Sequence, residues 1–199
     1  SWFEDGKTNL SYNCLDQNLE TRADKDALVF VNSEQKETRL TYQELHKLVI
    51  QFANHLTKLG IKKGDFITLY MPLSCEAIIA MLAIVRIGAV HSIVFAGFSA
   101  SALAQRIEDT KSNWLITADI AYRKGKELQL LETCLEAHKE SDFENVIVYN
   151  RSGKFEIPQN KEIKFYHFEN YLEESSTEDP IQWLDSEDPS FALYTSGST

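Results

Sequence analysis

The chain has 199 residues, of which 43% are hydrophobic and 25% are charged, and its formal net charge is -10. This apolar content is sufficient for the core of one domain or of part of a larger one. The acidic balance argues against a nucleic-acid partner, because it repels phosphate polyanions, so a bound nucleotide would need backbone donors, a metal or a few placed cations.

Strand and helix patterns alternate along the chain, which predicts an α/β fold. Residues 27–31 form an apolar strand, and residues 39–41 are expected to pair with it. The spacing then becomes helical, with Thr41 and Glu44 placed to form a capping box and Gly60 placed to end the helix. The predicted inward face of this helix carries Leu45, Leu48, Val49, Phe52, Leu56 and Leu59.

Five further strands and three further helices are predicted in alternation. The strands cover residues 66–71, 90–95, 114–117, 146–149 and 163–167, and the helices cover residues 75–87, 99–111 and about 127–140. Short connections between such elements imply right-handed crossovers around a largely parallel sheet. The polar stretch 173–179 is interpreted as an exposed linker, and we find no internal repeat.

The last nine residues predict a strand, 191–194, that runs into a loop of hydroxyl groups and glycine. Ligands gather at the carboxyl ends of parallel strands, so loops in this position are the first places to search for chemistry. Gly197 would let backbone amides approach an anion, and four hydroxyl groups would add donors, those of Thr195, Ser196, Ser198 and Thr199. On these residues alone an ordinary turn is the simpler interpretation, and no Walker-type lysine is present.

A second candidate loop, FAGFS at residues 95–99, follows the predicted strand 90–95. The small residues Ala96 and Gly97 would allow a ligand to lie against the backbone next to Phe95. Ser99 begins a helix, whose N-terminus favours negative charge. A tight turn from strand to helix is the alternative interpretation.

A third candidate loop, AYRKGK at residues 121–126, concentrates three cations around one glycine in an acidic protein. Arg123 offers a planar fork that suits phosphate, and Lys126 adds a second charge. Lys124 is expected to face solvent. A solvated cationic turn before a helix would explain the same residues equally well.

The remaining chemically active residue types give no site. The three cysteines are Cys14, Cys75 and Cys134. They lack the spacing of a disulfide framework or a zinc site, and we interpret them as free thiols in a reducing compartment, which predicts a cytoplasmic protein. The five histidines show no ligand spacing: His46, His55, His91, His138 and His167. His91 lies in an apolar strand and is expected to be a hydrogen-bonded core residue. We therefore assign no catalytic residue and no metal site.

The longest apolar run, around residues 78–85, lies between Glu76 and Arg86 and is too short to span a membrane. It is typical of a buried helix. The chain begins at Ser1 without an initiator methionine, so we expect the true N-terminus and any targeting signal to lie outside it.

A series of longer motifs runs in order from Trp2 to Thr199 and includes LTYQELH at 40–46, RIGAVH at 86–91, VFAGFSA at 94–100 and YTSGST at 194–199. The last motif resembles the opening of the signature loop of the adenylate-forming superfamily, and the whole series resembles the acetyl-coenzyme A synthetases of that superfamily. The resemblance implies that residues 1–40 are an N-terminal segment typical of these enzymes. Residues 41–199 would be the first α/β part of the AMP-binding large domain, with the small C-terminal domain absent.

The resemblance also implies a two-step reaction with ATP, Mg2+ and coenzyme A. Acetate is joined to the α-phosphate of ATP, pyrophosphate leaves, and the thiol of coenzyme A then attacks acetyl-AMP. Residues 195–199 would grip the ATP phosphates. Phe95, Ala96 and Gly97 would lie against the nucleotide portion of coenzyme A, with Arg123 and Lys126 beside its ribose 3'-phosphate. Many relatives have glycine at position 96 and arginine at position 126, so both contacts differ in detail here.

Two other functions remain open at this point. A propionyl-coenzyme A synthetase would share these motifs, because the acyl pocket lies after Thr199 in the family. A catalytically silent module that binds coenzyme A or a partner could retain the same fold. The partners implied are small molecules, with no nucleic acid and no membrane, and the oligomeric state is not predicted. The isolated chain is expected to be inactive.

Overall fold

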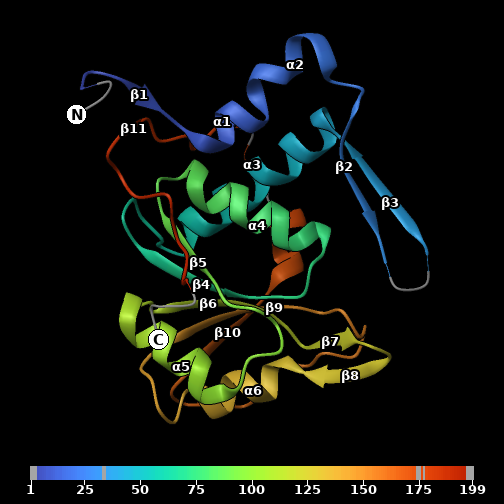
Figure 1. Cartoon of the computed structure of the whole chain (residues 1–199), viewed down its shortest axis with the longest axis vertical. Coiled ribbons are helices and arrows are strands. Elements are labelled where there is room, and N and C mark those ends of the chain that lie inside the picture. Colours follow the sequence, from blue (N-terminus) through green and yellow to red (C-terminus); the bar gives the residue numbers. More distant parts are fainter. Residues whose placement is uncertain (1–3, 33–34, 174–175, 177, 196–199) are drawn as a thin grey trace. The chain divides into compact units, whose positions relative to one another are not determined.

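The computed structural model describes residues 4–32, 35–173, 176 and 178–195. The chain divides into two compact units (Figure 1). The first unit comprises residues 1–64, 74–89 and 171–190, and the second comprises residues 65–73, 90–170 and 191–199. Each unit is described by itself below.

The first unit consists of helices, a two-stranded ribbon and one short strand pair. Its elements are β1 (Lys7–Thr8), α1 (Leu10–Cys14), α2 (Asp16–Arg22), β2 (Asp26–Val31), β3 (Glu37–Thr41), α3 (Tyr42–Lys58), α4 (Cys75–Arg86) and β11 (Leu184–Asp185). β2 and β3 pair antiparallel, as predicted, and β1 pairs antiparallel with β11.

The helix predicted from Thr41 is confirmed as α3. The Thr41 hydroxyl accepts a hydrogen bond from the Glu44 backbone N–H, and the Glu44 carboxylate accepts one from the Thr41 backbone N–H, which completes the capping box. The inward face of α3, which packs against α4, includes the buried residues Leu45, Val49, Phe52 and Leu56. α4 begins at a Ser74 cap and contains the apolar run that the sequence indicated to be a buried helix.

A buried ion-pair network lies at the end of α4. Arg86 has a fully buried side chain and pairs with Asp16 at 2.7 Å and with Asp179 at 2.6 Å. Ser11 and His46 complete the network, at 3.2 Å from Arg86 and 3.0 Å from Asp16 respectively. The sequence indicated that Asp179 belongs to an exposed linker. Asp179 itself is exposed, but its carboxylate accepts two hydrogen bonds from Arg86, the last residue of α4.

This network predicts a dependence of stability on pH. Burial by itself would raise the pKa of Asp16, but hydrogen bonds from Arg86 and His46 hold it well below its usual range. The unfolded value is about 3.9, so the carboxylate stabilises the fold above about pH 4, and this contribution is lost as the pH falls. We expect urea denaturation of the protein to show falling stability between about pH 5 and pH 3. Asp16→Asn should make that fall shallower, and an unchanged slope would contradict the assignment.

The second unit is built on a six-stranded sheet with the order β10-β9-β6-β4-β5-β12. Its strands are β4 (Phe66–Tyr70), β5 (Val90–Ile93), β6 (Trp114–Ala118), β9 (Asn145–Tyr149), β10 (Lys164–His167) and β12 (Phe191–Ala192). Every neighbouring pair is parallel, which confirms the predicted sheet. A 3-10 helix, η1 (Phe168–Glu173), follows β10 and crosses the boundary between the two units.

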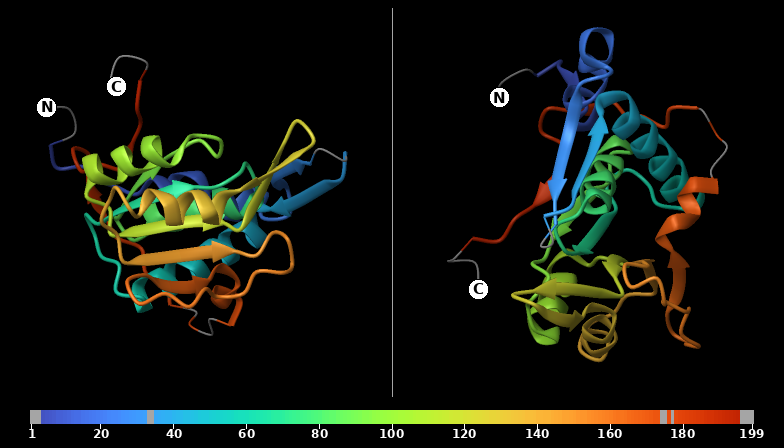
Figure 2. Two further views of the ribbon diagram at one scale, coloured as in Figure 1. Left: turned by 90° about the horizontal axis from the view of Figure 1, so that it is seen from below. Right: turned by 90° about the vertical axis from the view of Figure 1, so that its right-hand side faces the viewer.

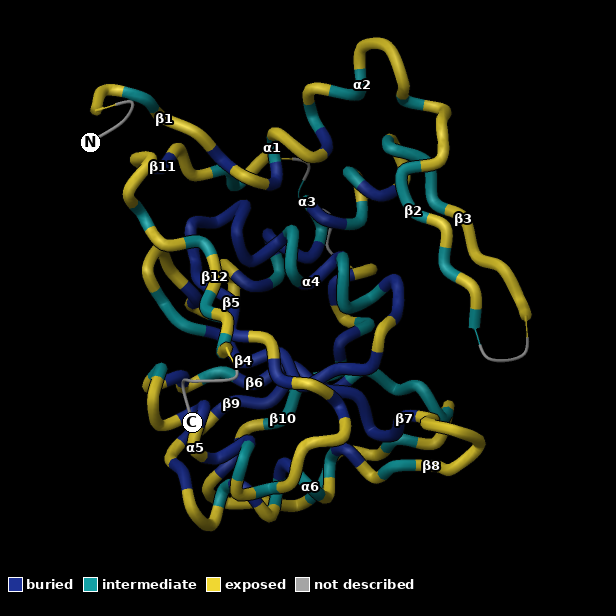
Figure 3. Tube along the Cα trace, in the orientation of Figure 1, coloured by how far each residue is buried: buried dark blue, intermediate teal, exposed yellow. Residues whose placement is uncertain are grey.

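Helices α5 (Ala100–Thr110) and α6 (Leu130–Ala137) contact each other and pack on strands β4 and β6 (Figure 2). Ser99 caps α5, as predicted. The resulting core includes Leu103 and Ile107 from α5, Leu130 and Cys134 from α6, and Leu115, Val146 and Val148 from the sheet. Figure 3 shows the central strands as buried along their length.

The prediction of a helix from Glu127 to Glu140 is wrong at its start and its end. Residues Lys126–Gln129 form strand β8, which pairs with β7 (Ile120–Arg123), and α6 covers only Leu130–Ala137. Lys124 and Gly125 both have positive φ, 51° and 75°, which is typical of a two-residue hairpin turn. The basic loop is therefore the tip of a hairpin, which is exposed in Figure 3.

Candidate functional site

The loop 95–99 is a tight turn at the carboxyl end of β5. The backbone N–H groups of Gly97 and Phe98 both donate to the Phe95 carbonyl, at 2.7 and 3.0 Å. The Tyr70 hydroxyl donates to the Phe98 carbonyl at 2.9 Å. Ala96 is buried, whereas the Phe95 ring is 52% exposed. The turn is thus held in place while one aromatic face remains accessible.

Arg123, on the β7–β8 hairpin, reaches the loop that contains Phe95 and Gly97. Its guanidinium carbon lies 5.1 Å from the centroid of the Phe95 ring. A Cβ atom placed on Gly97 would lie 2.9 Å from the Arg123 Nη1 atom, which is closer than real Cβ contacts allow. Lys126 is directly opposite Arg123 in the hairpin register. The structure therefore brings together two loops that the sequence indicated separately, with Ala96 in the same turn.

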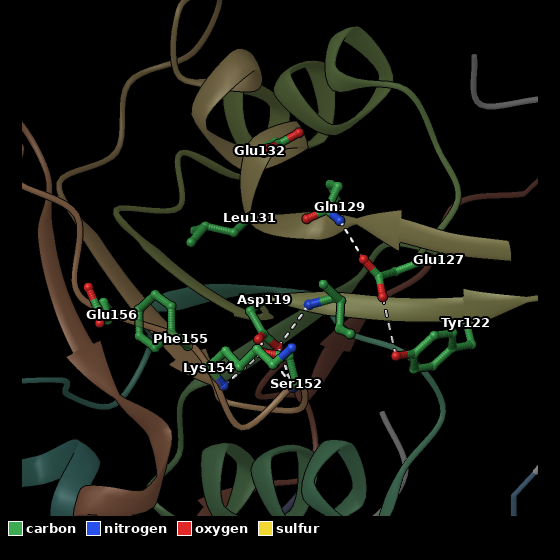
Figure 4. A pocket seen from close by; sticks show the side chains of 11 residues that line it. Asp119, Tyr122, Glu127, Gln129, Leu131, Glu132, Ser152, Lys154, Phe155 and Glu156 are labelled. Carbon is green, nitrogen blue, oxygen red and sulfur yellow. Dashed lines mark hydrogen bonds between the residues drawn. The ribbon is translucent and has the colours of Figure 1, made fainter.

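The opposite face of the hairpin has a different character. A cavity of about 440 Å³ lies there (Figure 4). Its lining includes Tyr122, Glu127 and Gln129 of the hairpin, together with Ser152, Lys154, Phe155 and Glu156. Tyr122 donates to the Glu127 carboxylate at 3.3 Å, and the Gln129 amide donates to it at 2.7 Å. Because this face carries carboxylates, an anionic phosphate is better matched to the Arg123 and Lys126 face.

Sequence reasoning did not find this cavity. Asp119 lies at its base, where its carboxylate accepts backbone hydrogen bonds from Ile120, Arg151 and Ser152, at 2.8 to 3.3 Å. These bonds give the carboxylate a structural role, because its acceptor capacity serves the surrounding backbone.

The predicted terminal strand is present as β12, which pairs with β5 through Phe191 opposite His91. Thr195 therefore follows a strand that is adjacent and parallel to the one that leads into the loop 95–99. Both loops leave the same edge of the sheet. Thr195 is exposed, and the predicted phosphate-binding residues Ser196, Gly197, Ser198 and Thr199 lie outside the described residues.

Arg106 is a residue of this edge that sequence reasoning missed. Its guanidinium carbon lies 4.8 Å from the ring centroids of both Phe98 and Tyr194. The available signal was a charged residue on the inward side of α5, beside the buried Leu103 and Ile107.

The histidine and cysteine predictions have mixed outcomes. His91 is buried and stacks on Phe191, and burial lowers its pKa to about 4, so its ring is neutral at pH 7. The prediction of a core residue is confirmed, and the Nδ1 atom has no hydrogen-bond partner among the described residues, so the expected hydrogen bond is absent at that atom. The three cysteines are free, as predicted, and burial raises the pKa of the Cys134 thiol to about 12.

Among the described residues, no group of three His, Cys, Asp or Glu side chains is arranged to hold a metal ion. In the same part of the chain, no helix has both the length and the apolar character needed to cross a membrane.

Known proteins are similar to this chain over all or most of its length. Residues 15–199 match a family model described as AMP-binding enzyme. The chain is 47% identical over 201 residues to an acetyl-coenzyme A synthetase of Thiobacillus denitrificans. It is 48% identical over 200 residues to that of Pasteurella multocida. All of the chain is covered in both cases, and it spans about 30% of the length of these curated relatives.

A solved structure gives the same result at the level of the fold. The acetoacetyl-CoA synthetase from Streptomyces lividans superposes with a TM-score of 0.85 at 26% identity. The match covers 96% of this chain and 29% of that one. The alternating α/β fold described above is therefore shared with the corresponding part of a longer protein.

Proposed function

Since the chain belongs to the family of AMP-binding enzymes, we propose that, at the full length of its relatives, it is an AMP-forming acyl-CoA ligase that uses acetate. The observation that carries this proposal is the identity of 47–48% along the whole chain to proteins named acetyl-coenzyme A synthetase. The contact between Arg123 and the turn at Gly97 supports the proposal independently, because it places a cation beside an accessible stretch of backbone.

In the proposed first step, a carboxylate oxygen of acetate attacks the α-phosphorus of ATP, and pyrophosphate leaves. Carboxylates are poor electrophiles, so this step converts acetate into a mixed anhydride, acetyl-AMP. The reaction depends chiefly on orientation and charge neutralisation. ATP would enter with its Mg2+, and residues 195–199 would hold its outer phosphates.

In the proposed second step, the sulfur of coenzyme A attacks the acetyl carbon, AMP leaves, and the thiol proton passes to solvent. The chain's contribution would be to bind and orient coenzyme A. Phe95, Ala96 and Gly97 would receive its nucleotide portion, and Arg123 and Lys126 would bind its ribose 3'-phosphate. A guanidinium that is already placed against the turn would need little rearrangement to donate to this phosphate.

Acetate-dependent exchange between ATP and pyrophosphate, measured on the full-length protein, tests the first step. Release of acetyl-CoA after addition of coenzyme A tests the second. Absence of exchange with acetate would favour a silent binding module and refute the proposal. The structural neighbour carries an acetoacetyl-CoA synthetase name, which indicates that this part of the fold occurs with a different acyl group. Acetate and propionate should therefore be compared by kcat/KM, and a higher value for propionate would reject acetate as the substrate.

We expect the isolated chain of residues 1–199 to release no pyrophosphate from ATP and acetate. It spans about 30% of the length of its relatives, so most of the proposed enzyme lies outside it. A pyrophosphate assay on the purified chain measures this. Acetate-dependent release above the rate without protein would contradict the expectation.

Gly97→Ala in the full-length protein should raise the KM for coenzyme A about fivefold, because the new methyl group would displace the Arg123 fork. Exchange between ATP and pyrophosphate should be unchanged. The matched control is the double variant Gly97→Ala/Arg123→Ala, which should be no worse than Arg123→Ala alone if Gly97 acts through Arg123. Additive losses would show that Gly97 contributes in another way.

A further inference from the structure

Tyr70 lies in the core between the turn 95–99 and the β7–β8 hairpin, the two loops proposed to bind coenzyme A. It is the last residue of β4. In the sheet β4 lies between β5, which leads into the turn, and β6, which leads into the hairpin (Figure 1). Tyr70 is only 1% exposed, and a buried tyrosine hydroxyl needs a hydrogen-bond partner. The position of that partner decides which loop the side chain holds.

Two hydrogen bonds connect Tyr70 to the elements on both sides of β4. Its hydroxyl donates to the Phe98 carbonyl in the turn at 2.9 Å. Its backbone carbonyl accepts a bond from the Thr117 hydroxyl at 2.8 Å, and Thr117 is opposite Tyr70 in the parallel register of β4 and β6. The residue also belongs to one buried cluster with Ala96 of the turn and Ala121 of the hairpin. One core residue therefore links the turn to the strand that leads into the hairpin.

The Tyr70 hydroxyl stays protonated. Burial raises its pKa to about 12, Cys134 adds to this rise, and Thr133 acts against it. Both of these neighbours belong to α6, which directly follows β8 of the hairpin. The hydroxyl therefore remains a hydrogen-bond donor at neutral pH, and the Phe98 carbonyl keeps its partner.

We propose that Tyr70 is a positioning residue that sets the turn 95–99 against Arg123. This rests on the proposed function for the identity of the ligand, coenzyme A. A Cβ atom at Gly97 would lie only 2.9 Å from the Arg123 Nη1 atom, so little free space separates the turn from the guanidinium. Without the Tyr70 hydroxyl, the carbonyl of the next residue, Phe98, loses a hydrogen bond. The turn then moves relative to Arg123, and the two fit the same ligand less well.

The test removes the hydroxyl alone, by Tyr70→Phe in the full-length protein. We expect the KM for coenzyme A in acetyl-CoA formation to rise about fivefold, the effect of one lost hydrogen bond. Acetate-dependent exchange between ATP and pyrophosphate should be unchanged, because coenzyme A takes no part in it. A role limited to overall stability would not separate these two measurements. The matched control is Ile147→Val, a buried change in β9 that should cost a similar amount of stability and leave the KM unchanged.

A double variant tests the route through Arg123. If Tyr70 acts by setting the turn against the guanidinium, Tyr70→Phe/Arg123→Ala should have nearly the same KM for coenzyme A as Arg123→Ala. Three outcomes would overturn the positioning role: additive losses, an unchanged KM in Tyr70→Phe, or equal losses by Tyr70→Phe in exchange and in acetyl-CoA formation. Each of these leaves the proposed function standing. A wild-type protein without acetate-dependent exchange would refute the proposed function, and this role with it, so the two failures are distinguishable.

Discussion

Replacing Arg86 with methionine is expected to lower the free energy of unfolding by about 3–5 kcal/mol. The side chain is fully buried and pairs with Asp16 and Asp179. Methionine fills most of the space but leaves the Asp16 carboxylate without its principal counter-charge. The loss should be measured by urea denaturation of the full-length protein at pH 7. Hydrogen exchange of α1, α2 and α4 should report the same loss locally.

The matched control is Arg39→Met. Arg39 also pairs with two carboxylates, those of Asp26 and Glu37, but about half of its side chain is exposed. Exposed pairs contribute little, so no measurable change in stability is expected there. Adding Asp16→Asn to Arg86→Met should recover part of the loss, because it removes the stranded charge. A loss below about 1 kcal/mol for Arg86→Met would contradict the importance of this network.

Local signals in the sequence were sufficient for most elements of the fold. The Thr41 and Glu44 capping box and the Ser99 cap depend on residues a few positions apart, and both helices begin where these signals predict. The Lys124 and Gly125 turn was also recognised. What failed was the assignment of residues 127–129 to a helix, since their pairing with β7 is a contact that local propensity does not report.

Long-range pairs could not be predicted from the sequence. Arg86 lies 70 positions from Asp16 and 93 from Asp179. The pairing depends on where three separate segments fold, which no periodicity encodes. The same is true of Arg106 and Tyr194. A charged residue within an apolar helix face was visible, but its partners were not.

From turn chemistry alone the candidate site was predictable as two loops, and only the family resemblance assigned both loops to one ligand. Turn chemistry identified the residues around Gly97 and those around Arg123 independently. Their proximity comes from the order of the sheet, in which β5 and β6 flank β4 and both run in the same direction. The extra constraint is that the guanidinium occupies the space that a Cβ atom at Gly97 would need. This close approach of Arg123 to Gly97 appears only in three dimensions.

Arg123→Ala in the full-length protein is expected to raise the KM for coenzyme A roughly 10- to 100-fold, the cost of a lost charge-assisted contact to phosphate. Exchange between ATP and pyrophosphate should be unaffected, because the first step does not involve coenzyme A. Lys124→Gln is the control. It removes the same charge one residue away, at the exposed tip of the hairpin, and should leave the KM nearly unchanged.

Dephospho-coenzyme A, which lacks the ribose 3'-phosphate, makes the Arg123 test specific to one contact. If Arg123 binds that phosphate, the wild type should bind dephospho-coenzyme A more weakly than coenzyme A. The factor should be about the same as the factor by which Arg123→Ala weakens the binding of coenzyme A. The variant should then show no further loss with the truncated substrate. Lys126→Arg should improve coenzyme A binding only when the phosphate is present, since it adds a bidentate fork. Equal losses by Arg123→Ala in exchange and in acetyl-CoA formation would instead indicate a general structural role for this arginine.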